Sequence, residues 1–121
     1  MAFVDYTELD VFKECRILVT NIYTISKEFP NEEIYGLTNQ IRRASISILS
    51  NLAEGVGRNS VKDSLQFFYI SRGSLYEVEA QLLIACDLGY ISENQLNEIL
   101  LQSTNCKKLL NGFINYHKSK L

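Results

Sequence analysis

The feature that most constrains the fold is a repeat of apolar residues at alternating steps of three and four. That spacing places the apolar side chains on one side of an α-helix. The first such seam consists of Val11, Cys15, Leu18, Ile22, Ile25 and Phe29. The chain has a single proline, Pro30, and most of its six glycines fall near breaks in the repeat, so long helices are permitted nearly everywhere else.

Four helices joined by short turns are predicted from these seams. The first begins at a capping box of Thr7 and Asp10 and ends at Phe29, because proline disfavours helical geometry in its predecessor. The others are expected over residues 37–54, over residues 61–88 and from Ser92 onward. Such a pattern predicts an all-α, up-down-up-down antiparallel four-helix bundle.

Glycines and hydroxyl residues mark the expected helix ends. Gly55 and Gly57 can adopt the left-handed conformation that closes the second helix, and Gly89 can close the third. The predicted N-terminal caps are Ser60 with Asp63 and Ser92 with Gln95.

The size and composition predict one domain, spanning residues 1–121. Hydrophobic residues make up 46% of the chain and charged residues 21%, which is ordinary for a globular protein. We expect a cytoplasmic protein with no membrane partner, because no basic leader or apolar run of about 20 residues is present. Cys15, Cys86 and Cys106 are odd in number and far apart, which is typical of reduced, buried thiols.

The third helix carries more apolar surface than one packed face requires. One seam, which also contains Arg72 and Glu79, consists of Leu65, Phe68, Leu75, Leu82 and Cys86. A second stripe consists of Phe67, Ser71, Ser74, Val78 and Ala85. This breadth predicts a surface for an additional partner.

No catalytic constellation is found, so no enzymatic activity, metal or cofactor is expected. A di-metal site in a four-helix bundle needs a Glu-x-x-His motif on two helices. The single histidine, His117, has no acidic residue three positions before it, and we expect it to be solvated near the chain end. Glu77 and Glu79 are two residues apart on a helix and point in different directions.

A set of polar residues lies within the apolar second and third helices. The set comprises Gln40, Arg43, Ser47, Asn51, Glu54, Arg72, Ser74, Glu77 and Glu79. Charges in a packed interface need partners, and arginine with glutamate is the pair with the best matched geometry. Two interpretations stay open: a network that sets helix register or subunit contacts, or a ligand or nucleic-acid site.

The net charge of the chain is −2, so any contact with nucleic acid depends on local groups of basic residues. Candidate nucleic-acid contacts are Arg42, Arg43, Arg58 and Lys62, with a further pair at Lys107 and Lys108. Such pairs are usually solvated, but repetition around a ring of subunits would form a positive collar able to hold phosphates.

A series of short motifs spans nearly the whole chain. In the first half the motif residues are Phe29-Pro30, Glu33, Tyr35 to Thr38, Gln40 to Ala44, Ser47-Ile48, Asn51 to Gly55 and Gly57-Arg58. In the second half they are Gly73 to Leu75, Glu77, Glu79, Gln81 and Gly89-Tyr90. This series closely resembles the signature of one family, the bacterial four-helix-bundle proteins of intervening sequences in 23S ribosomal RNA genes.

The resemblance implies an antiparallel bundle that forms a homopentamer and has no assigned enzymatic activity. A related type, the accessory variability determinant of diversity-generating retroelements, works with a reverse transcriptase and binds nucleic acid through a basic surface. This chain differs in its acidic balance, and Leu49 stands where many members have a proline. By the same likeness, the polar and glycine core would comprise Asn51, Glu54, Gly55, Arg58, Gly73, Ser74, Glu77 and Glu79.

The leading hypothesis is therefore a homo-oligomeric interaction or scaffold module, a pentamer by resemblance. The alternative is a nucleic-acid-binding protein or an accessory factor of a reverse transcriptase.

Overall fold

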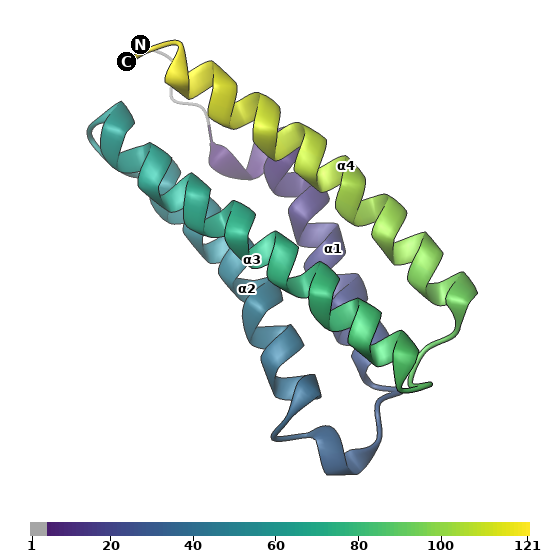
Figure 1. Ribbon diagram of the computed structural model, residues 1–121. Helices are drawn as coiled ribbons and strands as arrows, with labels where there is room; N and C mark the ends of the chain where they lie inside the picture. Colours follow the sequence, from purple (N-terminus) through teal and green to yellow (C-terminus); the bar gives the residue numbers. More distant parts are fainter. Residues whose placement is uncertain (1–4) are drawn as a thin grey trace.

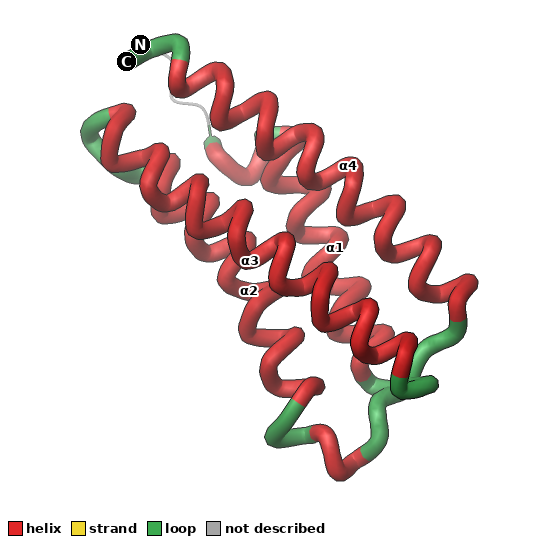
Figure 2. The backbone as a smooth tube through the Cα atoms, in the orientation of Figure 1, coloured by secondary structure: helices red, strands yellow, loops and turns green. Residues whose placement is uncertain are grey.

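The computed structural model describes residues 5–121, and that part of the chain is helical without any strand. The long helices are α1 (Asp10–Ser26), α2 (Leu37–Val56), α3 (Val61–Asp87) and α4 (Glu93–Lys118), with short 3-10 turns at Tyr6–Glu8 and Asn31–Glu33. They form the antiparallel four-helix bundle that the sequence predicts (Figures 1 and 2). Within the described residues, no helix combines the length and the apolar character needed to cross a membrane.

Each long helix packs against two neighbours. Helices α1 and α3 each contact α2 and α4, so α1 and α3 occupy diagonal corners of the bundle. The most extensive contact joins α2 to α3, which run side by side in Figure 1. The core between the helices is built from large, fully buried side chains, among them Leu18, Ile22, Ile41, Ile48, Phe68, Leu75, Leu82 and Leu110.

The predicted caps at both ends of α3 and at the start of α4 are confirmed. The Asp63 backbone N–H donates to Ser60 Oγ at 3.1 Å, and Ser92 with Gln95 forms a reciprocal capping box. Gly89 has a φ of 77°, the left-handed conformation that lets the chain leave α3.

The predicted start and end of the first helix are wrong. Leu9 is the residue before α1 and its side chain caps nothing, because Thr7 lies in a separate 3-10 turn, where its N–H donates to Asp5. Helix α1 also ends at Ser26, ahead of the proline, and short-range turns carry the chain to Phe29.

The expectation for Gly55 and Gly57 is also wrong, because neither has a positive φ. Gly57 follows α2 at a φ of −80°, and Gly55 is a buried residue within the helix. A Cβ atom on Gly55 would lie 2.4 Å from a ring carbon of Phe68. Glycine is needed there because α3 approaches closely, not because the chain turns.

The second apolar stripe of α3 packs inside the bundle and does not form the extra partner surface. Ser71, Val78 and Ala85 are buried, and Ser71 Oγ donates to the Ile48 carbonyl of α2 at 2.7 Å. Helix α3 therefore uses one side for α2 and another for α4. Any surface left for a partner lies on a third side.

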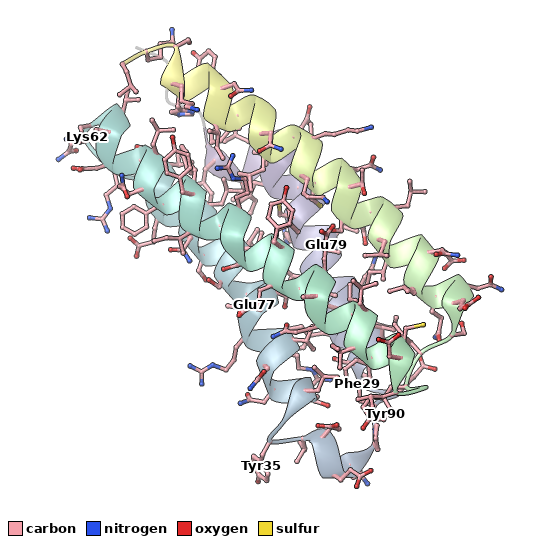
Figure 3. All side chains as sticks on the ribbon, viewed as in Figure 1. Phe29, Tyr35, Lys62, Glu77, Glu79 and Tyr90 are labelled. Carbon is pink, nitrogen blue, oxygen red and sulfur yellow. The ribbon has the colours of Figure 1, made fainter. Side chains whose placement is uncertain are left out.

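Glu33 ties the start of α2 to the loop before α4. One carboxylate oxygen accepts the Leu37 N–H at 3.0 Å, and the other accepts the Tyr90 hydroxyl at 2.7 Å. The Tyr90 ring in turn packs against Phe29, with ring centroids 5.7 Å apart (Figure 3). The hydrogen bond from Leu37, followed by that from Tyr90, lowers the pKa of Glu33 below its ordinary value of 4.5.

This depressed pKa predicts an acid-sensitive contribution to stability. Because the folded state favours the ionised carboxylate, the contribution is present above pH 4.5 and is lost as the pH falls through the folded pKa. In urea titrations, wild type should be more stable than Glu33→Gln at pH 7, and the difference should shrink below pH 4.5. The control is Glu32→Gln, an exposed neighbour. An equal difference between wild type and Glu33→Gln at all pH values would contradict the assignment.

Candidate functional site

The polar residues singled out in the sequence divide into separate groups on two sides of α3. Glu77 lies on the side of α2 and Glu79 on the side of α4 (Figure 3). Their spacing of two residues causes this separation, since successive helix positions differ in direction by about 100°. The set is therefore not one network.

On the α2 side, a pair of hydroxyl groups connects the two helices, and an amide group of α2 supports that pair. Ser74 Oγ donates to Ser47 Oγ at 2.8 Å. Asn51 Nδ2 donates to the Ser47 carbonyl at 2.9 Å and to its hydroxyl at 3.0 Å. Short side chains that bond across the contact let α2 and α3 stay close while their polar groups are satisfied.

Ser47 and Ser74 also line an open polar groove of about 330 Å³, here called the α2/α3 groove. Its lining residues are Gln40, Arg43, Ala44, Ser47, Ser74, Glu77 and Gln81. Arg43 and Glu77 are exposed and form no ion pair with each other. Gln81 Oε1 is buried and has no hydrogen-bond partner among the described residues.

Gln81 is a groove residue that was not among the predicted site residues. It lies seven residues after Ser74, so it shares the same side of α3. That spacing is the signal that identifies it.

On the α4 side, the charged residues of α3 are paired with residues of α4. Glu79 accepts from Ser103 Oγ at 2.7 Å and lies 3.0 Å from Lys107 Nζ. Arg72 Nη1 donates to Asn111 Oδ1 at 3.2 Å, and its guanidinium group lies over the Tyr69 ring. The expected pairing of arginine with glutamate does not occur in this group.

The partners on α4 were missed because they are unremarkable in the sequence. Ser103, Lys107 and Asn111 follow each other at steps of four, which places them along one side of α4. That periodicity shows that they share a side, but it does not show that α3 covers it.

Glu54 belongs to neither group. Its carboxylate lies 2.7 Å from Arg58 Nη2, one turn further along, and both side chains are about half exposed. Such a surface pair contributes at most about 1 kcal/mol.

The four candidate nucleic-acid contacts do not form one patch. Arg42 joins α2 to α1: its Nε donates to Ser26 Oγ at 2.8 Å and its guanidinium group lies over the Tyr23 ring. Arg58 is occupied by Glu54 and by the face of Phe67, 4.3 Å from the ring centroid.

Of these four candidates, only Arg43 and Lys62 are exposed and without an ion pair among the described residues. Lys62 lies at the start of α3, at the end of the bundle where α2 passes into α3 (Figure 3), whereas Arg43 lies in the first half of α2. The distance between Arg43 and the end of α2 is about 20 Å at 1.5 Å per residue.

His117 is not the solvated terminal side chain that we expected. Helix α4 extends to Lys118, so His117 remains helical and its Nδ1 lies 2.8 Å from the Phe113 carbonyl. The imidazole packs edge to face against Phe68, with centroids 4.9 Å apart. It is therefore part of an aromatic cluster at this end of the bundle.

The two fully buried cysteines, Cys15 on α1 and Cys106 on α4, behave as core residues. A hydrogen bond with the Cys106 thiol, followed by burial, raises the pKa of Cys15. The protonated thiol is a poor nucleophile. Cys86 is only half-buried, at the edge of the core.

Comparison with known proteins places this arrangement in a family. The family model of the 23S rRNA-intervening sequence protein matches residues 7–112. The chain belongs to this family. The matched segment contains both polar groups, from Gln40 on α2 to Asn111 on α4, and the Glu33–Tyr90 contact. No curated protein matches the chain.

One solved structure in particular is similar to this 23S rRNA-intervening sequence protein. It is a protein of unknown function from the S23 ribosomal protein family of Bacteroides thetaiotaomicron. The TM-score is 0.79 and the sequence identity 25%, over 86% of this chain and 97% of the other.

The Glu79–Lys107 pair offers a test of the α3–α4 polar contact. The side chains are only 16% and 24% exposed, so Lys107→Met leaves a carboxylate with little water and no cation. We expect a loss of about 1–3 kcal/mol in the free energy of unfolding, measured in urea. The double variant Glu79→Gln/Lys107→Met should recover most of it.

The matched control is Lys108→Met, an exposed neighbour without an ion pair, which should change stability by less than about 0.5 kcal/mol. If the single variant Lys107→Met and the double variant are equally stable, the unpaired charge of Glu79 is not the cause of the loss in the free energy of unfolding.

Proposed function

We propose that this chain is a non-enzymatic module that assembles with copies of itself through the outer side of α3. That side carries a seam spaced by three, four, three and four residues, here called the outer seam: Ile70, Gly73, Glu77, Ala80 and Ile84. Ile70 is 51% exposed and Ile84 is 49% exposed. Such spacing is typical of a helix that packs against another helix.

The observation that carries the proposal is the empty space beside Gly73. A Cβ atom built on this residue would meet nothing within 4 Å, so the bundle itself does not require glycine. Glycine inside a helix costs about 1 kcal/mol relative to alanine. Its presence on an exposed apolar seam supports close approach of another helix from outside.

Further apolar side chains widen the surface around the seam. Tyr76 and Leu83 of α3, and Leu88 directly after it, are all about half exposed. Single exposed apolar residues are normal, but a continuous group on one helix is typical of an interface. The sequence resemblance to bundle proteins that form homopentamers supports an assembly of five copies.

A glycine substitution tests the proposal. Gly73→Gln fills the space with a residue that favours helix, so the subunit should keep its helical circular dichroism while its ability to associate falls. Light scattering should show wild type at a multiple of 13.9 kDa and Gly73→Gln at 13.9 kDa.

Gly112→Gln provides the control, because Gly112 is an exposed glycine inside α4 with open space around it. This variant should keep the wild-type mass. Wild type with a mass of 13.9 kDa at micromolar concentration would contradict self-assembly.

The unpaired cations Arg43 and Lys62 favour a second candidate function, contact with nucleic acid, alone or beside a reverse transcriptase. If they contact phosphates, binding to RNA or DNA should weaken steeply as salt rises. Each substitution, Arg43→Ala or Lys62→Ala, should reduce the slope of log K against log salt by about 1.

Arg58→Ala should change that slope less, since Glu54 already neutralises Arg58. Absence of binding to any RNA or DNA at low salt would remove this candidate.

A further inference from the structure

A second surface of the bundle has the shape and charge to receive the outer seam of α3. It is a hollow of about 200 Å³ between α1 and α2, here called the α1/α2 groove. Its lining residues are Phe12, Ile46, Leu49, Ser50 and Ala53. All but Ser50 are apolar, and Ile46 is 42% exposed.

The charges beside the two surfaces are opposite. Arg16 lies one helical turn after Phe12, and Arg43 lies three residues before Ile46. The acidic residues at similar spacing, Glu8 and Glu54, are each held in an ion pair, so the unpaired charges beside the groove are cations. Glu77 is the charged residue of the outer seam and lies at the edge of the seam that also lines the α2/α3 groove. Among the described residues, neither the two arginines nor Glu77 has an ion-pair partner.

This distribution discriminates between the possible contacts. A seam packed against a second seam would bring Glu77 close to its own copy, and a groove against a groove would bring like cations together. Like charges in contact oppose association, whereas a seam in a groove pairs opposite charges. The favoured contact is therefore heterologous, with different surfaces on the two copies.

The positions of the two surfaces allow this contact to close into a ring. The groove lies between α1 and α2, and the seam lies on α3, which is next to α2 and diagonal to α1. The two surfaces are thus not on opposite sides of the subunit. Repetition of one contact between such surfaces turns around an axis and does not extend in a straight line.

We infer that the outer seam of one copy packs into the α1/α2 groove of the next, head to tail. This inference rests on the proposed self-assembly and names the surface that covers the seam. It also places the polar α2/α3 groove between the two contacts, on the side that faces the centre of the ring. Water in that centre accounts for a groove that is polar and open, although two helices form it.

Two variants, each altered in a different surface, test the contact. Ile46→Glu places a carboxylate in the α1/α2 groove against Glu77 and leaves the seam intact. Gly73→Gln blocks the seam and leaves the groove intact. Each variant alone should have the mass of one subunit, 13.9 kDa, by light scattering.

An equimolar mixture of the two variants should form a dimer with twice that mass. One copy supplies an intact seam and the other an intact groove, so one contact forms and the remaining two altered surfaces cannot continue the ring. A contact between identical surfaces would not be rescued in this way. The matched control is Leu101→Glu on α4, 66% exposed and outside both surfaces, which should keep the wild-type mass.

The outcomes separate this inference from the proposal on which it rests. A monomeric wild type overturns both. An oligomeric wild type together with a mixture that stays monomeric, or an Ile46→Glu variant of wild-type mass, overturns only the seam-in-groove contact. If Ile46→Glu loses its helical circular dichroism, Ser50→Glu replaces it, because Ser50 lines the same groove and is exposed.

Discussion

The close packing of α2 against α3 around Phe68 is the contact on which the rest of the structure depends. Gly55 lets the Phe68 ring lie directly against the backbone of α2. The other side of that ring meets Phe113 and His117 of α4, with centroids 5.0 and 4.9 Å away. One buried aromatic side chain thus joins three helices, and a larger residue at position 55 would force them apart.

Because α2 and α3 lie so close, the polar residues that bond between them are small. Ser47 and Ser74 bond directly to each other, and Ser71 bonds to the backbone of α2. Longer polar side chains, such as Gln40 and Arg43, lie further out and line a groove. A close helix pair with a polar margin therefore explains why the sequence carries so many polar residues inside apolar helices.

Helix α3 differs from the other helices because it is apolar on three sides. Two sides serve the bundle, toward α2 and α4, and the third carries the outer seam with Gly73. The charges follow the same division: Arg72 and Glu79 are paired with α4, whereas Glu77 on the outer seam is unpaired among the described residues. An apolar seam with one unpaired charge fits a partner of opposite charge, which the α1/α2 groove provides.

The sequence by itself determined the features that depend on local geometry. Apolar periodicity predicts the four helices, and the caps at Ser60, Gly89 and Ser92 follow from backbone groups that only neighbouring residues can satisfy. The motifs from Phe29 to Tyr90 were enough to indicate the family. By contrast, helical spacing gives the direction of a side chain but not which helix lies there.

Only the tertiary structure therefore decided that the stripe of Ser71 and Val78 packs inside the bundle, and that Asn111 and Lys107 serve as partners of α3. It also decided the role of Gly55, because a close approach leaves no signal in the spacing of a single helix. Partners distant in the chain are chosen by packing, and packing depends on all four helices at once.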